Sequence, residues 1–176
     1  MSGWIHIFDG APVREIESGA YLFRREEAVR SMFLVRAGAV ALERPLEDGT
    51  PLTLHVATPG TALAEASLFA ATYHCDAVAR SEASIANLPR VEFLTALRSE
   101  PDAALSLVET HAKEVQAQRA RIETLRLRRV ADRLDAWLDL HGEPRKGRWT
   151  EVANQIGVSP PALYRELARR RSRKEQ

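Results

Sequence analysis

The sequence DAALSLVETHAKEVQAQRARIETLRL, residues 102–127, decides how the rest of the chain is organised. Apolar or small residues recur in it at alternating steps of three and four, which is the spacing of a helix that pairs with another helix. Between residues 112 and 127 the other positions are mostly Lys, Glu, Gln and Arg, so the helix has one narrow apolar edge. The pattern predicts a long helix that pairs with a second copy of itself; the alternative is a helix that lies on its own domain. The predicted dimer seam consists of Leu105, Val108, Ala112, Val115, Arg119 and Ile122.

Charge is unevenly distributed along the 176 residues, although the formal net charge is only +1. Residues 1–100 contain 9 Arg or Lys and 13 Asp or Glu, whereas residues 101–176 contain 16 and 11. A basic C-terminal part on a nearly neutral protein indicates a localised site for a polyanion. A solvated tail is the alternative for residues 169–174.

Several protein classes are disfavoured by the sequence. The single cysteine, Cys75, excludes an intramolecular disulfide and a multi-cysteine metal cluster. We find no signal-peptide pattern and no apolar run of the length that spans a bilayer, so we expect a cytoplasmic protein without membrane contact. The sequence shows no nucleophile with its base, no paired catalytic carboxylates and no metal-ligand spacing, and we therefore do not expect an enzyme.

The first half of the chain reads as short strands. Apolar runs alternate with turn residues between residues 13 and 88, which predicts an antiparallel sandwich or barrel with residues 14–19 as an edge or turn segment. The reversals are expected at Gly19, Gly38, Asp48-Gly49 and Pro59-Gly60. The strand candidates are residues 21–24, 32–36, 40–44, 52–57, 77–80 and 84–88.

One segment interrupts this pattern. Residues 62–69, ALAEASLF, are rich in Ala and Leu and predict a short helix between strands. This segment holds Glu65 between apolar neighbours, where a buried carboxylate needs a hydrogen-bonding partner, a ligand or water. A carboxylate on the helix surface is the alternative.

The second half reads as helices that follow the predicted dimer helix. Residues 89–98 precede it as a helix opened by proline, a hinge is expected near residues 124–126, and residues 127–140 have a wider apolar face. The most specific signal is WTEVANQIGVSPPALYRELARR, residues 149–170, which predicts a helix-turn-helix. In it, Gly157 supplies a left-handed turn, helix caps are expected near Thr150 and at Ser159, and prolines occupy the first turn of the second helix. The expected packing positions are Ala153, Gly157, Leu163 and Leu167, and a generic helical hairpin is the alternative.

An ordered set of segments resembles the Crp/Fnr transcription regulators. The segments are GAYLFRREE (19–27), FLVRAGAVAL (33–42), PGTALAEASLF (59–69) and YHCDAVA (73–79). The resemblance implies an α+β fold with an N-terminal antiparallel β-roll, similar to a double-stranded jelly roll, in residues 1–100. A dimerisation helix would occupy residues 101–126 and a helix-turn-helix domain residues 127–176. The β-hairpin wing that usually follows is expected to be truncated or absent.

The resemblance also implies an effector pocket in the β-roll. In nucleotide-binding members the Glu of a Gly-Glu pair binds the ribose, and an Arg followed by Ser or Thr binds the cyclic phosphate. The resemblance places Ala64-Glu65 and His74-Cys75 at these two positions. It places Glu114-Val115 where the dimer helix contacts the base. Replacement of the Arg removes a permanent charge, so no cofactor is predicted and cyclic AMP is not the expected effector. The chain has too few cysteines to hold an iron-sulfur cluster, and haem binding is left open. Ordinary strand packing of His74 and Cys75 is the alternative to a ligand role. An unknown effector or a vestigial pocket remains.

The basic end carries the expected function. Arg165 lies one turn into the second helix, where Arg can donate two hydrogen bonds to guanine, and the other arginines are expected on phosphates. We expect a homodimeric regulator that binds a pseudo-palindromic operator in double-stranded DNA and works with RNA polymerase. The alternative is a ligand-binding or protein-interaction module that does not read DNA. The expected DNA-binding residues are Arg148, Thr150, Ser159, Ala162, Tyr164, Arg165, Arg169 and Arg170, with Arg171 as a further phosphate contact.

Overall fold

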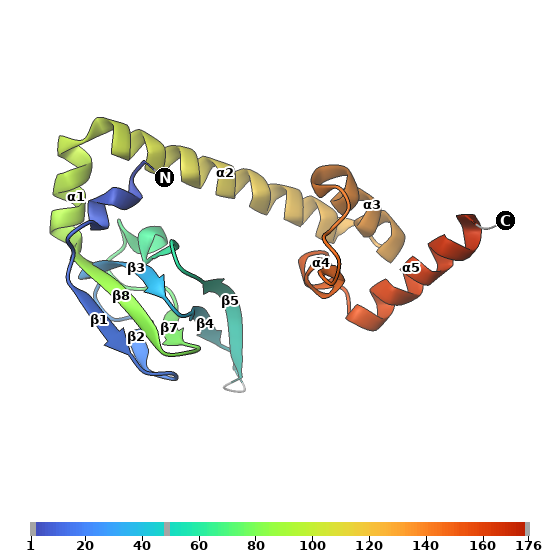
Figure 1. Cartoon of the computed structure of the whole chain (residues 1–176), viewed down its shortest axis with the longest axis horizontal. Coiled ribbons are helices and arrows are strands. Elements are labelled where there is room, and N and C mark those ends of the chain that lie inside the picture. The colour runs from blue at the N-terminus through green and yellow to red at the C-terminus, as the bar shows by residue number, and fades with distance from the viewer. Residues whose placement is uncertain (1–2, 48–49, 175–176) are drawn as a thin grey trace. The chain divides into compact units, whose positions relative to one another are not determined.

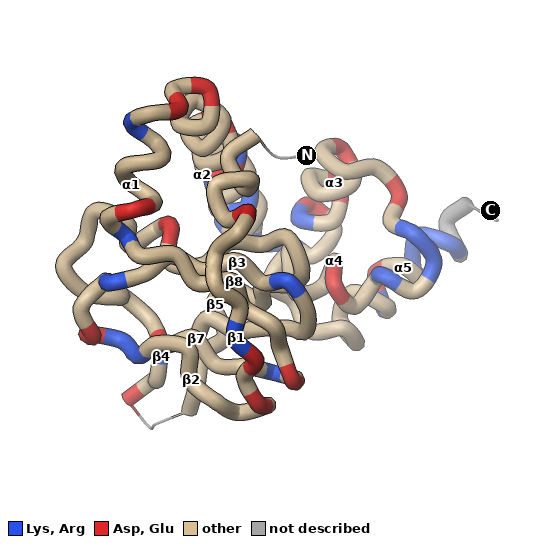
Figure 2. The backbone as a smooth tube through the Cα atoms, turned by 60° about the vertical axis from the view of Figure 1, so that its left-hand side comes forward, with Lys and Arg blue, Asp and Glu red and all other residues tan. Residues whose placement is uncertain are grey.

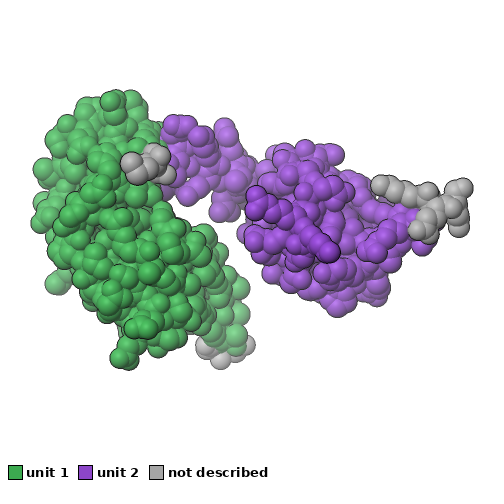
Figure 3. All heavy atoms as spheres, in the orientation of Figure 1, with its two compact units in different colours: residues 1–108 green, residues 109–176 purple. Residues whose placement is uncertain are grey.

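A computed structural model describes residues 3–47 and 50–174 of the chain (Figure 1). The chain divides into two compact units, residues 1–108 and 109–176 (Figure 3), and each is described by itself. The predicted Asp48-Gly49 turn lies outside the described residues.

Unit 1 contains two four-stranded antiparallel sheets. Their strand orders are β1-β8-β3-β6 and β2-β7-β4-β5. The strands are β1 (Val13–Ile16), β2 (Tyr21–Phe23), β3 (Ser31–Ala37), β4 (Val40–Pro45), β5 (Pro51–Ala57), β6 (Ala62–Leu63), β7 (Asp76–Ala79) and β8 (Ala83–Pro89). The strand candidates are thus confirmed with shifts of at most one residue at their ends, and β1 is an edge strand. The predicted α+β fold with an N-terminal antiparallel β-roll is confirmed.

Apolar side chains from both sheets share one core. Val35 and Ile85 from one sheet and Val40 and Ala77 from the other are fully buried in it. The 3₁₀ turn η1 (Ile5–Phe8) and the helix α1 (Arg90–Ser99) extend this core, because the ring of Phe8 lies 5.6 Å from that of Phe93. Burial of such aromatic rings stabilises the contact between elements that are far apart in sequence.

The helix predicted for residues 62–69 is wrong. Residues 62–63 form strand β6, which pairs with β3 through Phe33 and Leu63, and only a 3₁₀ turn, η2 (Glu65–Ser67), follows. The strand pairing overrides the helix propensity of Ala and Leu, which is a weak preference per residue. Between β6 and η2, Ala64 has φ +74°, in the left-handed region.

Unit 2 is helical, and its first helix begins in unit 1. The helices are α2 (Pro101–Arg126), α3 (Val130–His141), α4 (Trp149–Gln155) and α5 (Pro160–Lys174). Leu134 of α3, Val152 and Ala153 of α4, Ile156 of the turn and Leu163 of α5 form a separate buried core. Among the described residues, every helix is too short or too polar to cross a lipid bilayer.

The helix-turn-helix prediction agrees with the backbone at the turn and differs at the start of α4. Gly157 has φ +66°, so the predicted left-handed turn is confirmed. The expected cap near Thr150 is wrong, because α4 begins at Trp149 and Arg148 is the N-cap, without a side-chain hydrogen bond. The proline predicted in the first turn of α1 instead precedes the helix, because Pro89 is the N-cap and α1 begins at Arg90.

Gly38 is the glycine with the strictest requirement in unit 1. Its φ is +79°, and an added Cβ would lie 2.7 Å from Cα of Ala83 and closer still to the carbonyl oxygen of Glu82. We predict that Gly38→Ala lowers the free energy of unfolding by about 3 kcal/mol, because backbone strain and a backbone clash act together. Gly60→Ala is the matched control, since Gly60 has φ +88° but open space around its Cα, and should cost about 1 kcal/mol. Urea unfolding measures both values, and equal losses would contradict the prediction.

Candidate functional site

Backbone hydrogen bonds and a buried apolar core fix the helix-turn-helix of unit 2. The amide of Val158 donates to the carbonyl oxygen of Ala153 at 3.0 Å, and the amides of Ala162 and Leu163 donate to that of Ser159 at 2.9 and 3.1 Å. Leu163 is fully buried, so the first turn of α5 is fixed against α3 and α4. The next residues of α5 are thereby presented on a fixed framework.

The opposite face of α5 is open. Ser159, Tyr164 and Arg165 are exposed, and Ala162 is half-buried. Because Ala162, Arg165 and Arg169 follow one another at steps of three and four, they lie on one face of the helix. Within the described part of the chain the guanidinium of Arg165 forms no hydrogen bond or ion pair. It is therefore available to an external partner.

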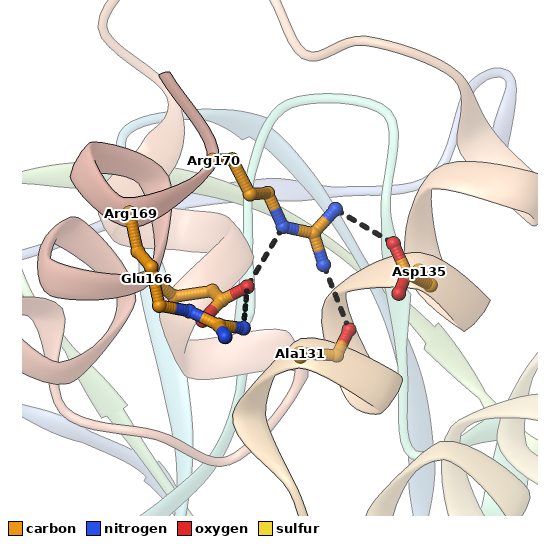
Figure 4. A network of polar contacts seen from close by, with 5 residues as sticks. All are labelled: Ala131, Asp135, Glu166, Arg169 and Arg170. Atoms are coloured by element: carbon orange, nitrogen blue, oxygen red, sulfur yellow. Dashed lines mark hydrogen bonds and ion pairs between the residues drawn. The ribbon is translucent and has the colours of Figure 1, made fainter. Parts of the chain in front are cut away.

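Several cations follow one another in the second half of α5, where Figure 2 shows the blue of Lys and Arg. Two of them are committed to a polar network that Figure 4 shows in detail. Arg170 donates to Asp135 at 2.6 Å, to the carbonyl oxygen of Ala131 at 3.0 Å and to Glu166 at 2.9 Å. Arg169 donates to both carboxylate oxygens of Glu166 at 2.9 Å.

This network fixes the charge of Glu166, which is only 9% exposed. Burial alone would raise the pKa of the carboxyl, but the hydrogen bonds and charges of Arg170 and Arg169 outweigh it and hold the pKa below its ordinary value. Arg170 consequently ties α5 to α3. A phosphate contact by Arg170 would break these bonds, whereas Arg148 is exposed and forms an ion pair with Glu151, three residues later on α4.

The side chain of Arg133 joins the end of α2 to the turn between α4 and α5. The guanidinium of Arg133 donates to the carbonyl oxygens of Leu127 at 2.7 Å and of Leu125, Ile156 and Gly157 at 3.1 Å each. These carbonyls belong to two segments about 30 residues apart in sequence, so one side chain bonds both. A Cβ added to Gly157 would lie 2.6 Å from Cδ2 of Leu125, which shows how closely the two segments approach.

The seam residues of α2 are all exposed. Leu105 and Val108 are 67% and 64% exposed, and Val115 and Ile122 are 48% and 51% exposed. Ala103 and Leu107, on another face of α2, are buried in the core of unit 1. The alternative of a helix that lies on its own domain therefore holds for the buried face, and the predicted seam remains open.

The expected effector residues fall in both units. Ala64, Glu65, His74 and Cys75 lie in unit 1, while Glu114 and Val115 are exposed on α2 in unit 2. The structure therefore does not show the six residues as one pocket. In unit 1, the Nδ1 atom of His74 lies 2.9 Å from the hydroxyl oxygen of Ser67, so His74 contacts the turn that carries Glu65.

Cys75 points the other way and is 1% exposed. Burial raises the pKa of its thiol, which keeps the thiol protonated and lowers its reactivity. The guanidinium of Arg44 lies nearby and donates to the carbonyl oxygen of His74 at 3.4 Å. His74 is exposed and Cys75 is buried, and both precede β7, so the alternative of strand packing does not describe them.

The family model described as "Cyclic nucleotide-binding domain" matches residues 13–100. These residues include every strand of unit 1. The chain belongs to the cyclic nucleotide-binding domain family. A comparison with curated protein sequences found no match.

Solved structures of this family extend the likeness beyond the β-roll. The catabolite activator protein of Thermus thermophilus is 22% identical, with a TM-score of 0.57 over 96% of this chain and 82% of that chain. The c-di-GMP responsive global regulator CLP of Xanthomonas campestris is 19% identical, with a TM-score of 0.63 over 99% and 93%. FixK2 of Bradyrhizobium japonicum is 16% identical, with a TM-score of 0.63 over 93% and 86%. These likenesses show the fold, and the predicted β-roll followed by a helical C-terminal part is confirmed.

The cyclic nucleotide-binding domain of this chain has an alanine at a backbone position that favours glycine. Ala64 has φ +74°, a conformation that costs an L-residue roughly 1–2 kcal/mol and glycine almost nothing. The backbone thus agrees with the expectation that Ala64 occupies the glycine position of the family's Gly-Glu pair. His74, which is expected at the phosphate position of the family, contacts Ser67.

The hydrogen bonds of Arg133 could not be predicted from the sequence, and a substitution tests their contribution to the free energy of unfolding. We predict that Arg133→Met lowers the free energy of unfolding by about 3 kcal/mol, because four carbonyl oxygens lose a charged donor. Arg128→Met removes an equal charge from an exposed position and should change the stability by less than about 0.5 kcal/mol. Urea unfolding followed by tryptophan fluorescence measures both. Equal effects of the two variants would show that the carbonyl bonds contribute nothing.

Proposed function

We propose that this chain is a homodimeric, sequence-specific DNA-binding transcription regulator of the Crp/Fnr type. The observation that carries the proposal is the exposed, unengaged guanidinium of Arg165 on the second helix of a closed helix-turn-helix. The printed names of similar structures support it, since they include a catabolite activator protein and a global regulator. A regulatory protein of this kind is not an enzyme.

In the proposed complex, the first half of α5 enters the major groove. Arg165 donates two hydrogen bonds to the O6 and N7 atoms of a guanine, and Tyr164 and Ala162 contact neighbouring base edges or the sugar-phosphate backbone. Arg148, Thr150, Ser159 and Arg171 contact phosphates, which contributes affinity without sequence information. Arg169 and Arg170 would support α5 through Glu166 in this arrangement.

Pairing of two copies through the seam of α2 sets the distance between the two recognition helices. Burial of an apolar side chain such as Val115 or Ile122 gains roughly 1.5–3 kcal/mol when it is complete, so the pairs along α2 supply the main gain. Arg119 lies on the same edge and is exposed; a polar residue at such a place fixes register at some cost in stability. The two α5 helices would then reach half-sites about 34 Å apart, and the operator would be pseudo-palindromic.

The β-roll is the proposed effector domain, and its effector differs from a simple cyclic nucleotide. A cyclic phosphate would meet His74, a group without permanent charge, where the family places an arginine. We therefore propose an effector that is not cyclic AMP.

The experiment that tests the function is a selection of bound sequences from random duplex DNA by the intact chain. We predict one enriched pseudo-palindromic site, and about a 10- to 100-fold loss of preference for it with Arg165→Ala, because a bidentate base contact contributes about 1–3 kcal/mol of discrimination. Arg171→Ala is the matched control: an exposed phosphate contact should weaken all sequences alike and reduce the salt dependence. If no sequence is enriched, the chain is a ligand-binding or protein-interaction module instead.

A further inference from the structure

A groove of about 560 Å³ lies within unit 2, between α2, α3 and α4. Its α2 side is lined by Lys113, Gln116, Gln118 and Arg121 and by three small residues one turn apart, Ala117, Ala120 and Thr124. Their short side chains leave the space that longer residues would fill. The volume lies within the range of small-molecule sites, which is roughly 300–1,000 Å³.

Two apolar side chains of α3 form the opposite wall. They are Trp137 and Leu140, and Leu140 remains 59% exposed. The indole N–H of Trp137 donates to the side-chain oxygen of Gln155 on α4 at 2.6 Å, which fixes the plane of the ring. The ring of His141 lies 4.8 Å from that of Trp137, so the wall is largely aromatic. Such a wall favours contact with a flat ring.

The charge of the groove has one sign. Lys113 and Arg121 line it, and no aspartate or glutamate is among its lining residues in the described part of the chain. Lys113 is paired with Glu109 at 2.5 Å, outside the lining. Arg121 is exposed, and within the described residues its guanidinium has no hydrogen bond or ion pair. A planar guanidinium beside an apolar wall suits a ligand with both a ring and an anionic group.

The groove does not compete with the dimer seam for the same face of α2. With 3.6 residues per turn, Ala117, Ala120 and Thr124 are centred roughly 180° around the helix from Val115 and Ile122. Pairing of two copies through the seam therefore leaves the groove side of α2 free.

We propose that this groove binds a small aromatic anion, with its ring against Trp137 and Leu140 and its carboxylate or sulfonate on Arg121. The site is separate from the β-roll, where the effector of the proposed regulator would bind. It does not rest on DNA binding, so the two proposals succeed or fail independently.

The test uses two probes of equal size and opposite charge, 2-naphthoate and 2-naphthylmethylammonium. Titration calorimetry of the intact chain should give saturable binding of one naphthoate per chain and at least about tenfold weaker binding of the ammonium probe, because one charge-assisted contact is gained and the other repelled. In the ¹⁵N NMR spectrum the indole signal of Trp137 should shift on addition of naphthoate, and that of Trp4, in unit 1, should not. Absence of saturable naphthoate binding, or equal binding of both probes, would overturn the proposal.

Variants locate the site. Arg121→Gln should weaken naphthoate binding about tenfold, and Ala117→Leu, at an exposed position, should fill the groove and abolish it. Arg126→Gln is the control, since it removes the same charge from α2 outside the groove and should leave binding unchanged. Circular dichroism of each variant confirms the fold. If Arg126→Gln weakens binding as much as Arg121→Gln does, or if Ala117→Leu binds normally, the assignment of the groove is wrong.

Discussion

The apolar edge of α2 is the constraint on which the rest of this structure depends. Three faces of α2 have different surroundings. Ala103 and Leu107 are buried in the core of unit 1, Thr124 is buried in unit 2, and the seam is exposed to water. Exposure of Leu105, Val108, Val115 and Ile122 along one edge is unfavourable unless another apolar surface covers them. In the proposed dimer, a second copy of the same edge would supply that surface with the right spacing.

The helix-turn-helix is connected to this edge by hydrogen bonds to the backbone. Arg133 bonds the carbonyl oxygens at the end of α2 and those of the turn before α5 with one planar group, so a shift of α2 against the turn would break several charge-assisted bonds at once. At the far end of α5, Arg170 and Glu166 make a second connection to α3. The orientation of α5 in unit 2 is therefore fixed at both ends.

The strands and the helix-turn-helix could be predicted from the sequence, because patterns within short segments determine them. Alternation of apolar residues located the strands, and Gly157 with Ser159 and two prolines located the turn and the start of α5. Residues 62–69 were wrongly predicted because a strand pairing with β3 decides their conformation, and no local pattern reports that pairing. The bonds of Arg133 and Arg170 could not be predicted for the same reason: their acceptors are carbonyls and carboxylates that tertiary structure brings together. Whether the expected effector and DNA residues act together stays a prediction.

The measurement that tests the account most directly is the mass of the intact chain in solution by sedimentation equilibrium over a range of protein concentrations. One chain has a mass of 19.6 kDa. If the seam of α2 pairs two copies, the measured mass will be twice that value and will decrease towards 19.6 kDa only on dilution. A mass of 19.6 kDa at every concentration would contradict the account, because the exposed edge of α2 would then need no partner.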